Sequence, residues 1–439
     1  MLNTDSNAKL TFSTDTLLFD TVFTKLGGGN NPRSVNKRFV VRNPYNETIK
    51  TSIYLAGGNA SPFRINIDGV PTTAINDIEI MPKDSIYILA EVTIDPFGVN
   101  NPLIVKDSIV FMTNGNMQDI KLVAWGQDAY YFSDSVLDCN TVWDKIDKPY
   151  VIYNSVLVSQ NCKLTINAGV KIFSDVGSVI YVAGTLEING DKDNRVSMKG
   201  ARLGFAFDKV PGQWQGIHFL TTSKDSKINF ADIFNAVIGV RVDSVSLNTN
   251  KKCTIKNSII RNMSAVGILG YSASIEAENC EITNCGKYNF AADLGGDIKV
   301  NHCTFGNDAA TFTRKDPAFI LSNADYEDEN KNTFINPLKF SVTNNIIWGE
   351  QKDEIEIYTG GKGTVTAVLE QNMLKTLGTT FPASNRKNIN PKFKDVTQQD
   401  FSLDDTSPAI DAATGSSILI DLKGNPRIGT PDLGAYEKQ

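Results

Sequence analysis

The stretch CTIKNSIIRN (253–262) recurs as SIEAENCEITN (274–284) and again as DIKVNHCTFGN (297–307), and this repetition decides the fold. The apolar landmark of each copy is Ile260, Ile282 and Phe305, so the repeat advances by 22 and then 23 residues. Self-similarity at such a period is the signature of a solenoid. Three further stretches align with these: KINFADIFNA (227–236), KFSVTNNIIWG (339–349), which carries Ile347 after an insertion, and AVLEQNMLK (367–375).

The spacing has a physical meaning, because parallel strands cannot be joined by a hairpin and the gaps hold no helical periodicity. A chain that repeats three short strands and three turns per coil solves the problem by winding, with equivalent positions stacked about 4.8 Å apart. A second sandwich would show no common column, and leucine-rich repeats would contain more leucine. The column that we expect to form a turn ladder is Asp232, Ser258, Cys280, Cys303, Asn345 and Asn372.

The same pattern of short strand-like segments extends toward the N-terminus, with glycine at the expected turns. It is seen in KLTINAGVKIFSD (163–175), SVIYVAGTLEINGD (178–191) and GQWQGIHFL (212–220). We therefore predict that residues 129–439 form a right-handed parallel β-helix. Because the last coil of a solenoid has unpaired strand edges, we expect residues from about 388 to 439 to form a cap.

Before this solenoid, residues 10–128 read as short alternating strands separated by Gly, Asn and Pro. In Ser85–Val92 an apolar side chain recurs at every second position, which is the period of a half-buried antiparallel strand. About seven such strands predict an immunoglobulin-like β-sandwich, preceded by a flexible tail at 1–9. No aromatic cluster or carboxylate pair stands out here, so we favour a spacer over a binding module. The chain is thus expected to be all-β.

Nearly the whole chain resembles surface proteins of Bacteroidetes. The first part is similar to their immunoglobulin-like domains in DTLLFDTVF (15–23) and IKLVAWGQDA (120–129). The second part is similar to their right-handed β-helix proteins, of the pectate-lyase-like fold, in LTINAGVKI (164–172), NNIIWGE (344–350) and above all the tail DLGAYE (432–437). The resemblance implies an exported protein of the outer membrane surface or periplasm. It also implies an N-terminal lipid anchor on a cysteine upstream of Met1.

Composition excludes several functions. A net charge of −6 argues against nucleic acid as a partner, since its binders carry a basic face. No run of 18 apolar residues exists, so we expect no membrane span. The start MLNTDSNAKL (1–10) has no basic segment before an apolar one, so we expect any export signal to lie upstream.

The six cysteines form no CxxC pair and no zinc-finger spacing, and with two histidines in the chain we expect neither a metal nor any other cofactor. Cys139 and Cys162 lie 23 residues apart, about one coil, so they are a candidate disulfide between adjacent turns. Cys280 and Cys303 have the same spacing but fall in the turn column, where we favour a stack of buried free thiols.

The acidic residues show no hydrolase signature, and we assign no catalytic residue. Glu354 and Glu356 share a strand face, but we expect both to point outward as a solvated edge. Asp404 and Asp405 fall in the expected cap, where turn chemistry explains them. Polysaccharide lyases of this architecture need a basic residue beside acidic calcium ligands, and hydrolases need converging carboxylates.

Aromatic faces stack on sugar rings, and a long shallow groove along a β-helix suits an extended glycan. The candidate contacts are Trp214, His218, Tyr271 and Tyr288, although packing at a coil corner explains Trp214 equally well. We favour packing for Trp348.

Six triplets of the form Asp-Ser/Thr-aliphatic resemble the O-glycosylation acceptor motif of exported Bacteroidetes proteins. A turn residue that feeds a strand gives the same pattern. The candidate acceptors are Thr16, Thr21, Ser85, Ser108, Ser135 and Ser244.

The sequence thus favours a non-catalytic cell-surface protein that binds a polysaccharide or host glycan or acts in adhesion. One alternative is a polysaccharide lyase or glycoside hydrolase on the β-helix. Another is a structural stalk or an accessory subunit of a surface complex.

Overall fold

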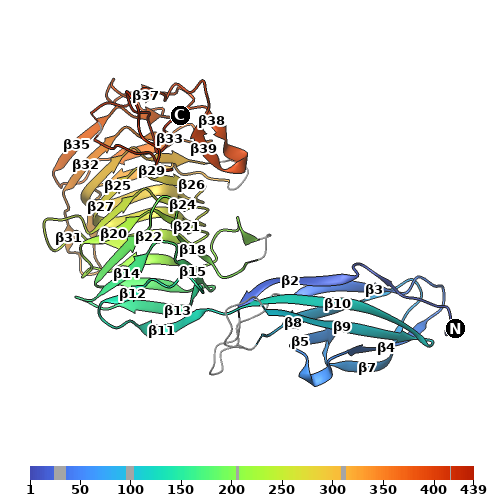
Figure 1. Ribbon diagram of the computed structural model, residues 1–439. Helices are drawn as coiled ribbons and strands as arrows, with labels where there is room; N and C mark the ends of the chain where they lie inside the picture. The colour runs from blue at the N-terminus through green and yellow to red at the C-terminus, as the bar shows by residue number, and fades with distance from the viewer. Residues whose placement is uncertain (24–35, 95–102, 204–206, 308–312, 416) are drawn as a thin grey trace. The chain divides into compact units, whose positions relative to one another are not determined.

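A computed structural model of the protein describes residues 1–23, 36–94, 103–203, 207–307, 313–415 and 417–439. The chain divides into two compact units, a first that begins at Met1 and a second that takes over at Tyr131. Figure 1 shows that both are built from strands.

The first unit is a β-sandwich of two five-stranded sheets. Strand β8 shows the expected alternation, because Ile86, Ile88 and Ala90 are buried in the core while Tyr87 and Leu89 are exposed. One sheet has the order β1 (Thr11–Phe12), β3 (Lys37–Arg42), β8 (Ser85–Val92), β5 (Phe63–Ile67) and β6 (Val70–Pro71). The other has the order β2 (Thr16–Phe23), β10 (Asn116–Gln127), β9 (Leu103–Thr113), β4 (Ile49–Leu55) and β7 (Ala74–Ile80).

Residues 1–9, which the sequence suggested as a flexible tail, are packed on the sandwich instead. Leu2 bridges to Thr48, and Ala8 is fully buried in the core cluster. The side chains of Asn114 and Asn116 donate hydrogen bonds to main-chain oxygens of residues 3–8. The residues that make these contacts lie in a hairpin more than 100 residues away, so the local sequence does not predict them.

The second unit is the predicted right-handed parallel β-helix, built from three parallel ladders that we call faces A, B and C. Figure 1 shows the coils stacked from β11 (Tyr130–Val136) to β37. Face A contains the second half of β13 (Tyr150–Val158), β16 (Val179–Val182), β19 (Gly216–Phe219), β22 (Ile238–Asp243), the first halves of β25 (Val266–Glu278) and β27 (Tyr288–Asn301), β29 (Phe319–Ser322) and β34 (Ile355–Tyr358).

Faces B and C complete each coil. Face B contains β12 (Thr141–Trp143), β14 (Lys163–Asn167), β17 (Thr185–Asn189), β20 (Ser226–Asn229), β23 (Cys253–Lys256), the second halves of β25 and β27, β32 (Leu338–Thr343) and β35 (Val365–Glu370). Face C contains the first half of β13, β15 (Lys171–Ser174), β18 (Val196–Gly200), β21 (Ala231–Phe234), β24 (Ile259–Arg261), β26 (Glu281–Thr283), β28 (Thr304–Gly306), β33 (Ile346–Trp348), β36 (Met373–Leu374) and β37 (Arg386–Lys387).

The register reproduces the repeat found in the sequence. Ile260 lies beside Ile282, which lies beside Phe305, and all three are fully buried inside the helix. The expected turn column also forms, with one correction. Asp232 pairs with Ile259, so the residue that stacks with Ser258 is Ala231. The sequence alignment was one residue out of step there.

Each coil passes from face B to face C through a residue in the left-handed region. This position is occupied by Asn257, Asn279, His302 and Asn344, with φ between 49° and 58°. Asparagine tolerates this conformation well, and the side chain of Asn279 donates to that of Asn257 at 2.7 Å. His302 interrupts the series: it is fully buried, and neither ring nitrogen has a hydrogen-bond partner among the described residues.

Burial lowers the pKa of His302 to about 3, below its ordinary value of 6.5. The unfolded chain therefore binds a proton at this residue before the folded protein does. The stability associated with neutral His302 is present above pH 6.5 and is lost as the pH falls toward 3. We expect His302→Asn to flatten this loss by about 1.4 kcal/mol per pH unit between roughly pH 6.5 and 4. Urea denaturation at several pH values measures the slope, and an unchanged slope would contradict the assignment.

The N-terminal coil is closed by aromatic stacking and by a covalent link. Trp143 lies 4.8 Å from Tyr150 and 5.1 Å from Phe132 between ring centroids. Cys139 and Cys162, one coil apart, are joined as a disulfide with Cα atoms 4.5 Å apart. The other four cysteines are free and buried.

Because the Cys139–Cys162 link closes a loop of 23 residues, it should contribute about 3 kcal/mol in the chain-entropy model. We expect protein made in an oxidising compartment to contain this bond, and Cys139→Ser/Cys162→Ser to unfold at lower denaturant concentration. Mass spectrometry of non-reduced peptides tests the bond. Recovery of both thiols free in exported protein would refute it.

The C-terminal segment covers the side of the helix more than its end. Tyr436 donates its hydroxyl proton to the buried carboxylate of Glu281, and the main-chain nitrogen of Ala435 donates to Thr304. Phe401, in the hairpin of β38 (Phe393–Asp395) and β39 (Asp400–Leu403), packs near Ile259. These partners lie on the outer surface of face C. The expected cap therefore exists, but residues 388–439 do not cross the ends of all three ladders.

Candidate functional site

Three of the four predicted glycan contacts lie on the outer surface of face A. His218 is on β19, Tyr271 is on β25 and Tyr288 is on β27. His218 points outward because its neighbours Ile217 and Phe219 are buried inside the helix, and side chains alternate along a strand. Strands far apart in sequence thus bring these residues onto one surface.

The strand register gives the order of the outward-pointing residues along face A. Tyr181, His218 and Arg241 occupy successive rungs of one outer column. Asp243, Tyr271 and Asp293 occupy successive rungs of the neighbouring column, near the corner with face B. Sequence analysis identified only His218 and Tyr271 of these six. The step from Tyr271 to Asp293 matches the 22-residue period of the repeat, whereas the step from Asp243 to Tyr271 is 28 residues and does not follow from it.

A polar cluster lies at the centre of this surface. The Nε2 atom of His218 is 2.6 Å from Oδ2 of Asp243, and Nε of Arg241 donates to Oδ1 of Asp243 at 3.0 Å. Burial opposes ionisation of Asp243, but the hydrogen bonds from His218 and Arg241 outweigh it and lower the pKa of the carboxyl. Asp243 is therefore a fixed anion that orients both neighbours.

Aromatic and apolar groups continue the surface. The guanidinium of Arg241 lies 5.4 Å from the centroid of the Tyr271 ring, and the ring of Tyr181 is 5.7 Å from that of His218. Tyr288 carries the ammonium of Lys287 over its ring at 4.9 Å. Both tyrosines pack against an apolar strip, in which Val266, Leu269 and Ala291 are buried and Ile238, Ala265 and Ile320 are partly buried.

Behind the polar cluster lies a fully buried lysine, Lys252. Burial lowers the pKa of its ammonium to about 8, and four oxygens accept hydrogen bonds from it. The shortest runs to the main-chain oxygen of Asp243, at 2.6 Å, and another to the hydroxyl of Ser244, at 2.8 Å. Lys252 thus ties the turns after β19 and β22 together and fixes the backbone that carries Asp243.

We expect Lys252→Met to destabilise the protein by about 3 kcal/mol, because it leaves carbonyl groups in the buried turn without a donor. Lys251→Met is the matched control, since Lys251 is adjacent but pairs with Asp297 at the surface. Chemical denaturation of both variants gives the comparison. Equal effects would show that the buried ammonium has no special role.

Trp214, the fourth predicted contact, is not on this surface. Its side chain is fully buried, and Nε1 donates to the main-chain oxygen of Phe234 at 2.9 Å. It is a packing residue and cannot reach a glycan. Trp348 is half-buried against the core under the C-terminal segment, as expected of packing.

The expectation that Glu354 and Glu356 form an outward acidic edge is wrong for Glu354. Its side chain is fully buried, and its carboxylate accepts two hydrogen bonds from Arg314, at 2.7 and 2.8 Å. The main-chain nitrogen of Ala318 adds a third, at 2.9 Å. Burial raises the pKa of Glu354, against the opposing charge of Arg314. A carboxylate held in this way cannot pair with the exposed Glu356 in catalysis. The signal missed was Arg314, 40 residues away.

The remaining acidic candidates are explained by local structure. Asp404 accepts hydrogen bonds from the nitrogen and hydroxyl of Thr406, which is turn chemistry. The described residues contain no group of three or more His, Cys, Asp or Glu that would hold a metal ion. Within the same ranges, no helix is long and apolar enough to cross a membrane.

The candidate acceptors for O-glycosylation differ in their surroundings. Thr16, Ser85 and Ser108 are half-buried in the sandwich, and the side chain of Thr21 lies outside the described residues. The hydroxyl of Ser135 donates to Ser133, at 3.2 Å. The hydroxyl of Ser244 is bonded to the buried ammonium of Lys252, at 2.8 Å.

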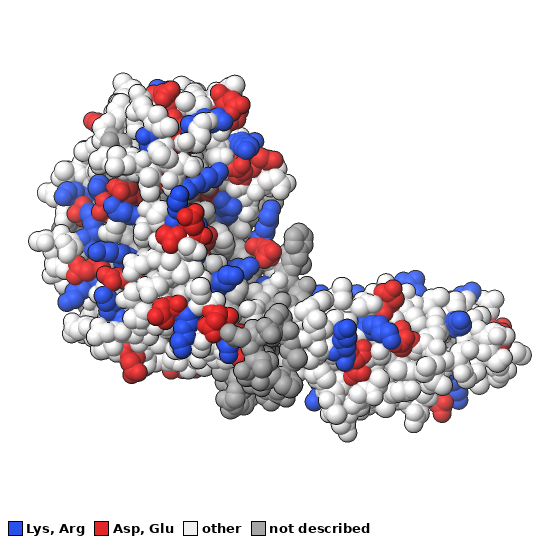
Figure 2. Space-filling model, viewed as in Figure 1, with Lys and Arg blue, Asp and Glu red and all other residues white. Residues whose placement is uncertain are grey.

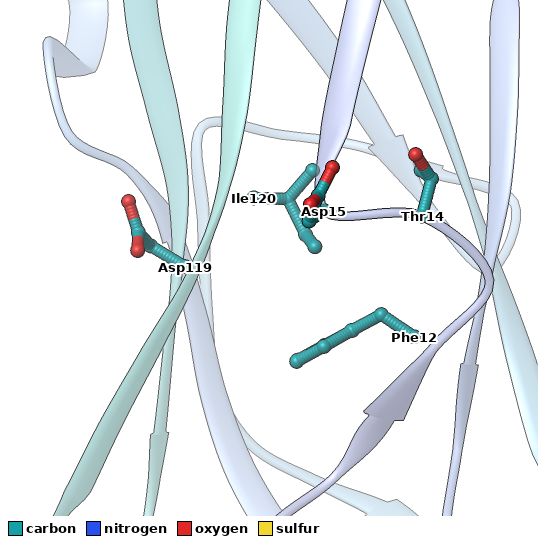
Figure 3. A pocket seen from close by; sticks show the side chains of 5 residues that line it. All are labelled: Phe12, Thr14, Asp15, Asp119 and Ile120. Carbon is teal, nitrogen blue, oxygen red and sulfur yellow. The ribbon is translucent and has the colours of Figure 1, made fainter.

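Figure 2 shows acidic and basic side chains interspersed over the viewed surface of the second unit, without a field of one sign. The sandwich has a separate cavity of about 430 Å³, lined by Phe12, Thr14, Asp15, Asp119 and Ile120 (Figure 3). Asp119 in its wall is engaged by Lys121, whose hydrogen bond lowers the pKa of the carboxyl. Nothing in this lining points to a particular ligand.

No protein-family model matches the chain, and no curated protein matches it. Among solved structures, the chain is similar to the catalytic unit of a GH87 alpha-1,3-glucanase from Streptomyces thermodiastaticus strain HF3-3. That match has 10% identity, covers 82% of this chain and 83% of the other, and has a TM-score of 0.23.

Other similarities cover about a quarter of the chain. The YadV chaperone shares 12% identity with a TM-score of 0.18, over 26% of this chain and 50% of its own. The CooA pilin subunit from enterotoxigenic Escherichia coli shares 9% identity with a TM-score of 0.20, over 27% of this chain and 97% of its own. The chain thus spans half the length of the chaperone. TM-scores this low carry no argument about function, and the fold is established by the strand register above.

Proposed function

We propose that this protein is a non-catalytic, exported surface protein that binds a glycan on the outer surface of face A. The observation that supports this most is the gathering of His218, Tyr271 and Tyr288, from three separate coils, beside an apolar strip. Tyr181, Arg241 and Asp243 complete the surface.

The chemistry of this surface suits a sugar chain. Tyrosine rings pack against the C–H faces of pyranose rings, and they lose little conformational entropy in doing so. The imidazole of His218 and the guanidinium of Arg241 are held in place by Asp243, so they are preorganised donors for hydroxyl groups. Face A carries charges of both signs, such as Arg241 and Asp243, which favours a neutral glycan over a polyanion.

Glycoside hydrolysis is the second candidate, and Asp243 and Asp293 are the observation that favours it. They lie two rungs apart on one column, so their Cα atoms are about 10 Å apart. An inverting hydrolase needs two carboxyls at a similar separation, one of them a general acid with a raised pKa. The pKa of Asp243 is lowered and its oxygens are occupied by His218 and Arg241. This supports a binding surface over an active site.

The resemblance to Bacteroidetes surface proteins supports the cellular setting. We infer that the protein is held at the outer membrane surface or in the periplasm by an N-terminal lipid anchor, with the immunoglobulin-like sandwich as a spacer. O-glycosylation at one or more of the candidate acceptors, such as Ser85, fits an exported protein. A structural stalk without a ligand is the remaining alternative.

The test is affinity electrophoresis and calorimetry of the purified chain on a panel of neutral polysaccharides, pectins, glycosaminoglycans and mucin glycans. We expect binding to one neutral glycan without release of reducing or unsaturated ends. Tyr271→Ala and His218→Ala should each weaken it about tenfold or more, the cost of losing an aromatic or a polar hot-spot contact.

Tyr87→Ala is the matched control, because Tyr87 is an exposed tyrosine of the sandwich, outside face A. It should leave binding unchanged. Glycan cleavage that Asp243→Asn or Asp293→Asn abolishes would replace the proposal with the hydrolase. Absence of binding across the panel would leave the stalk.

A further inference from the structure

Two ladders of the β-helix end in strands that pair along one side only. β34 pairs with β29, and β35 pairs with β32. Within the described residues no strand lies along their other edges, and Val365–Val368 receive no hydrogen bond there from the C-terminal segment. Face C differs, because β36 is followed by β37. Every second residue of β35 therefore presents its N–H and C=O to solvent.

The core is also open at this end. Val365 and Ala367 stack on Leu338 and Phe340, which are buried inside the preceding coil. Val365 is nevertheless 38% exposed, and Ala367 is exposed as well. Beside them, Val368 is 40% exposed and Tyr358 of β34 is 48% exposed. Interior positions of a solenoid are covered by the next coil, and here no further strand covers Val365 and Ala367 among the described residues.

The C-terminal segment does not provide that cover. It lies on the outer surface of face C, as the bond between Tyr436 and Glu281 shows. Near β35, the side chain of Asn385 reaches only the main-chain oxygen of Leu369, at 2.8 Å. The edge from Val365 to Val368 stays open.

The sequence of β35, VTAVLE, lacks the usual protection of an exposed edge. Val365–Leu369 contain no charge and no proline, and three of the five are β-branched. The charges lie outside this core, with Glu370 at one end and Lys362 just before the other. The side chain of Lys362 is 70% exposed and has only a distant partner, Asp325, at 3.9 Å.

We propose that this end of the β-helix docks a second copy of the same chain, with β35 of each copy paired antiparallel about a two-fold axis. An alignment centred on Ala367 sets Glu370 opposite Thr364 of the second copy, two residues from its Lys362. The two termini of the strand are thus complementary in charge only when the copies run antiparallel. The pairing joins face B of both copies and covers Val365 and Ala367, as an isologous interface does.

The experiment is sedimentation velocity of the full chain over a wide concentration range. We expect a monomer–dimer equilibrium, with the outward-pointing amides of residues 365–368, which do not bond to β32, protected from hydrogen exchange only in the dimer. Val365→Lys/Val368→Lys should weaken the dimer at least tenfold, because two charges enter the edge. Val176→Lys is the control: Val176 is a 59% exposed valine in a turn far from this end, and its variant should still dimerise.

A charge-reversal cycle identifies the partner as a second copy. Lys362→Glu and Glu370→Lys should each weaken the dimer severalfold, and the double variant should restore it. A monomer at every concentration would overturn the proposal and leave the edge to another protein. A dimer that persists in Val365→Lys/Val368→Lys, or a cycle without restoration, would place the contact elsewhere and overturn it equally.

Discussion

The second unit depends on the stacking of each coil on the one before it. Parallel strands of successive coils lie about 4.8 Å apart and are joined by main-chain hydrogen bonds. This stacking brings equivalent residues of successive coils into contact, so the side chains in one column must pack or pair favourably with one another. Inside, Ile260, Ile282 and Phe305 form a continuous apolar column. Outside face B, charges alternate instead: Lys163 pairs with Glu187 at 3.0 Å and Lys299 with Glu276 at 2.7 Å. Like charges directly opposite would be destabilising.

The same stacking explains why the candidate site is a surface and not a deep cleft. The outer columns of a regular ladder are flat, and specificity has to come from side chains arranged along neighbouring rungs. On face A these side chains are fixed from below. The buried ammonium of Lys252 holds the main chain of Asp243, whose carboxylate in turn holds His218 and Arg241. This hierarchy gives a rigid pattern of donors and rings without any strand leaving the ladder.

The first and last coils of a solenoid each have strand edges without a neighbouring coil, and the two ends of this β-helix are closed in different ways. The first coil is closed by Phe132, Trp143 and Tyr150 and by the Cys139–Cys162 link. At the other end the chain turns back along face C, where Glu281 is buried between Arg261 and Tyr436. That choice stabilises one face and leaves β34 and β35 with open edges. Part of the outer surface of face C is therefore buried, whereas the edges of β34 and β35 are exposed to solvent.

The sequence by itself determined the periodic features. Repeats of 22 and 23 residues were enough to predict the β-helix and the stacked column around Ser258 and Cys280, and GIHFL (216–220) indicated a strand at His218. Where the coil length is constant, as between Ile260, Ile282 and Phe305, the period alone says which residues stack. The tertiary structure decided whatever depends on contacts outside that period. Trp214 is buried inside the unit. Glu354 is buried because it forms an ion pair with Arg314, which lies in an insertion. The C-terminal segment lies along face C, where Tyr436 forms a hydrogen bond with Glu281. These contacts join residues at separations unrelated to the repeat, and no local pattern encodes them.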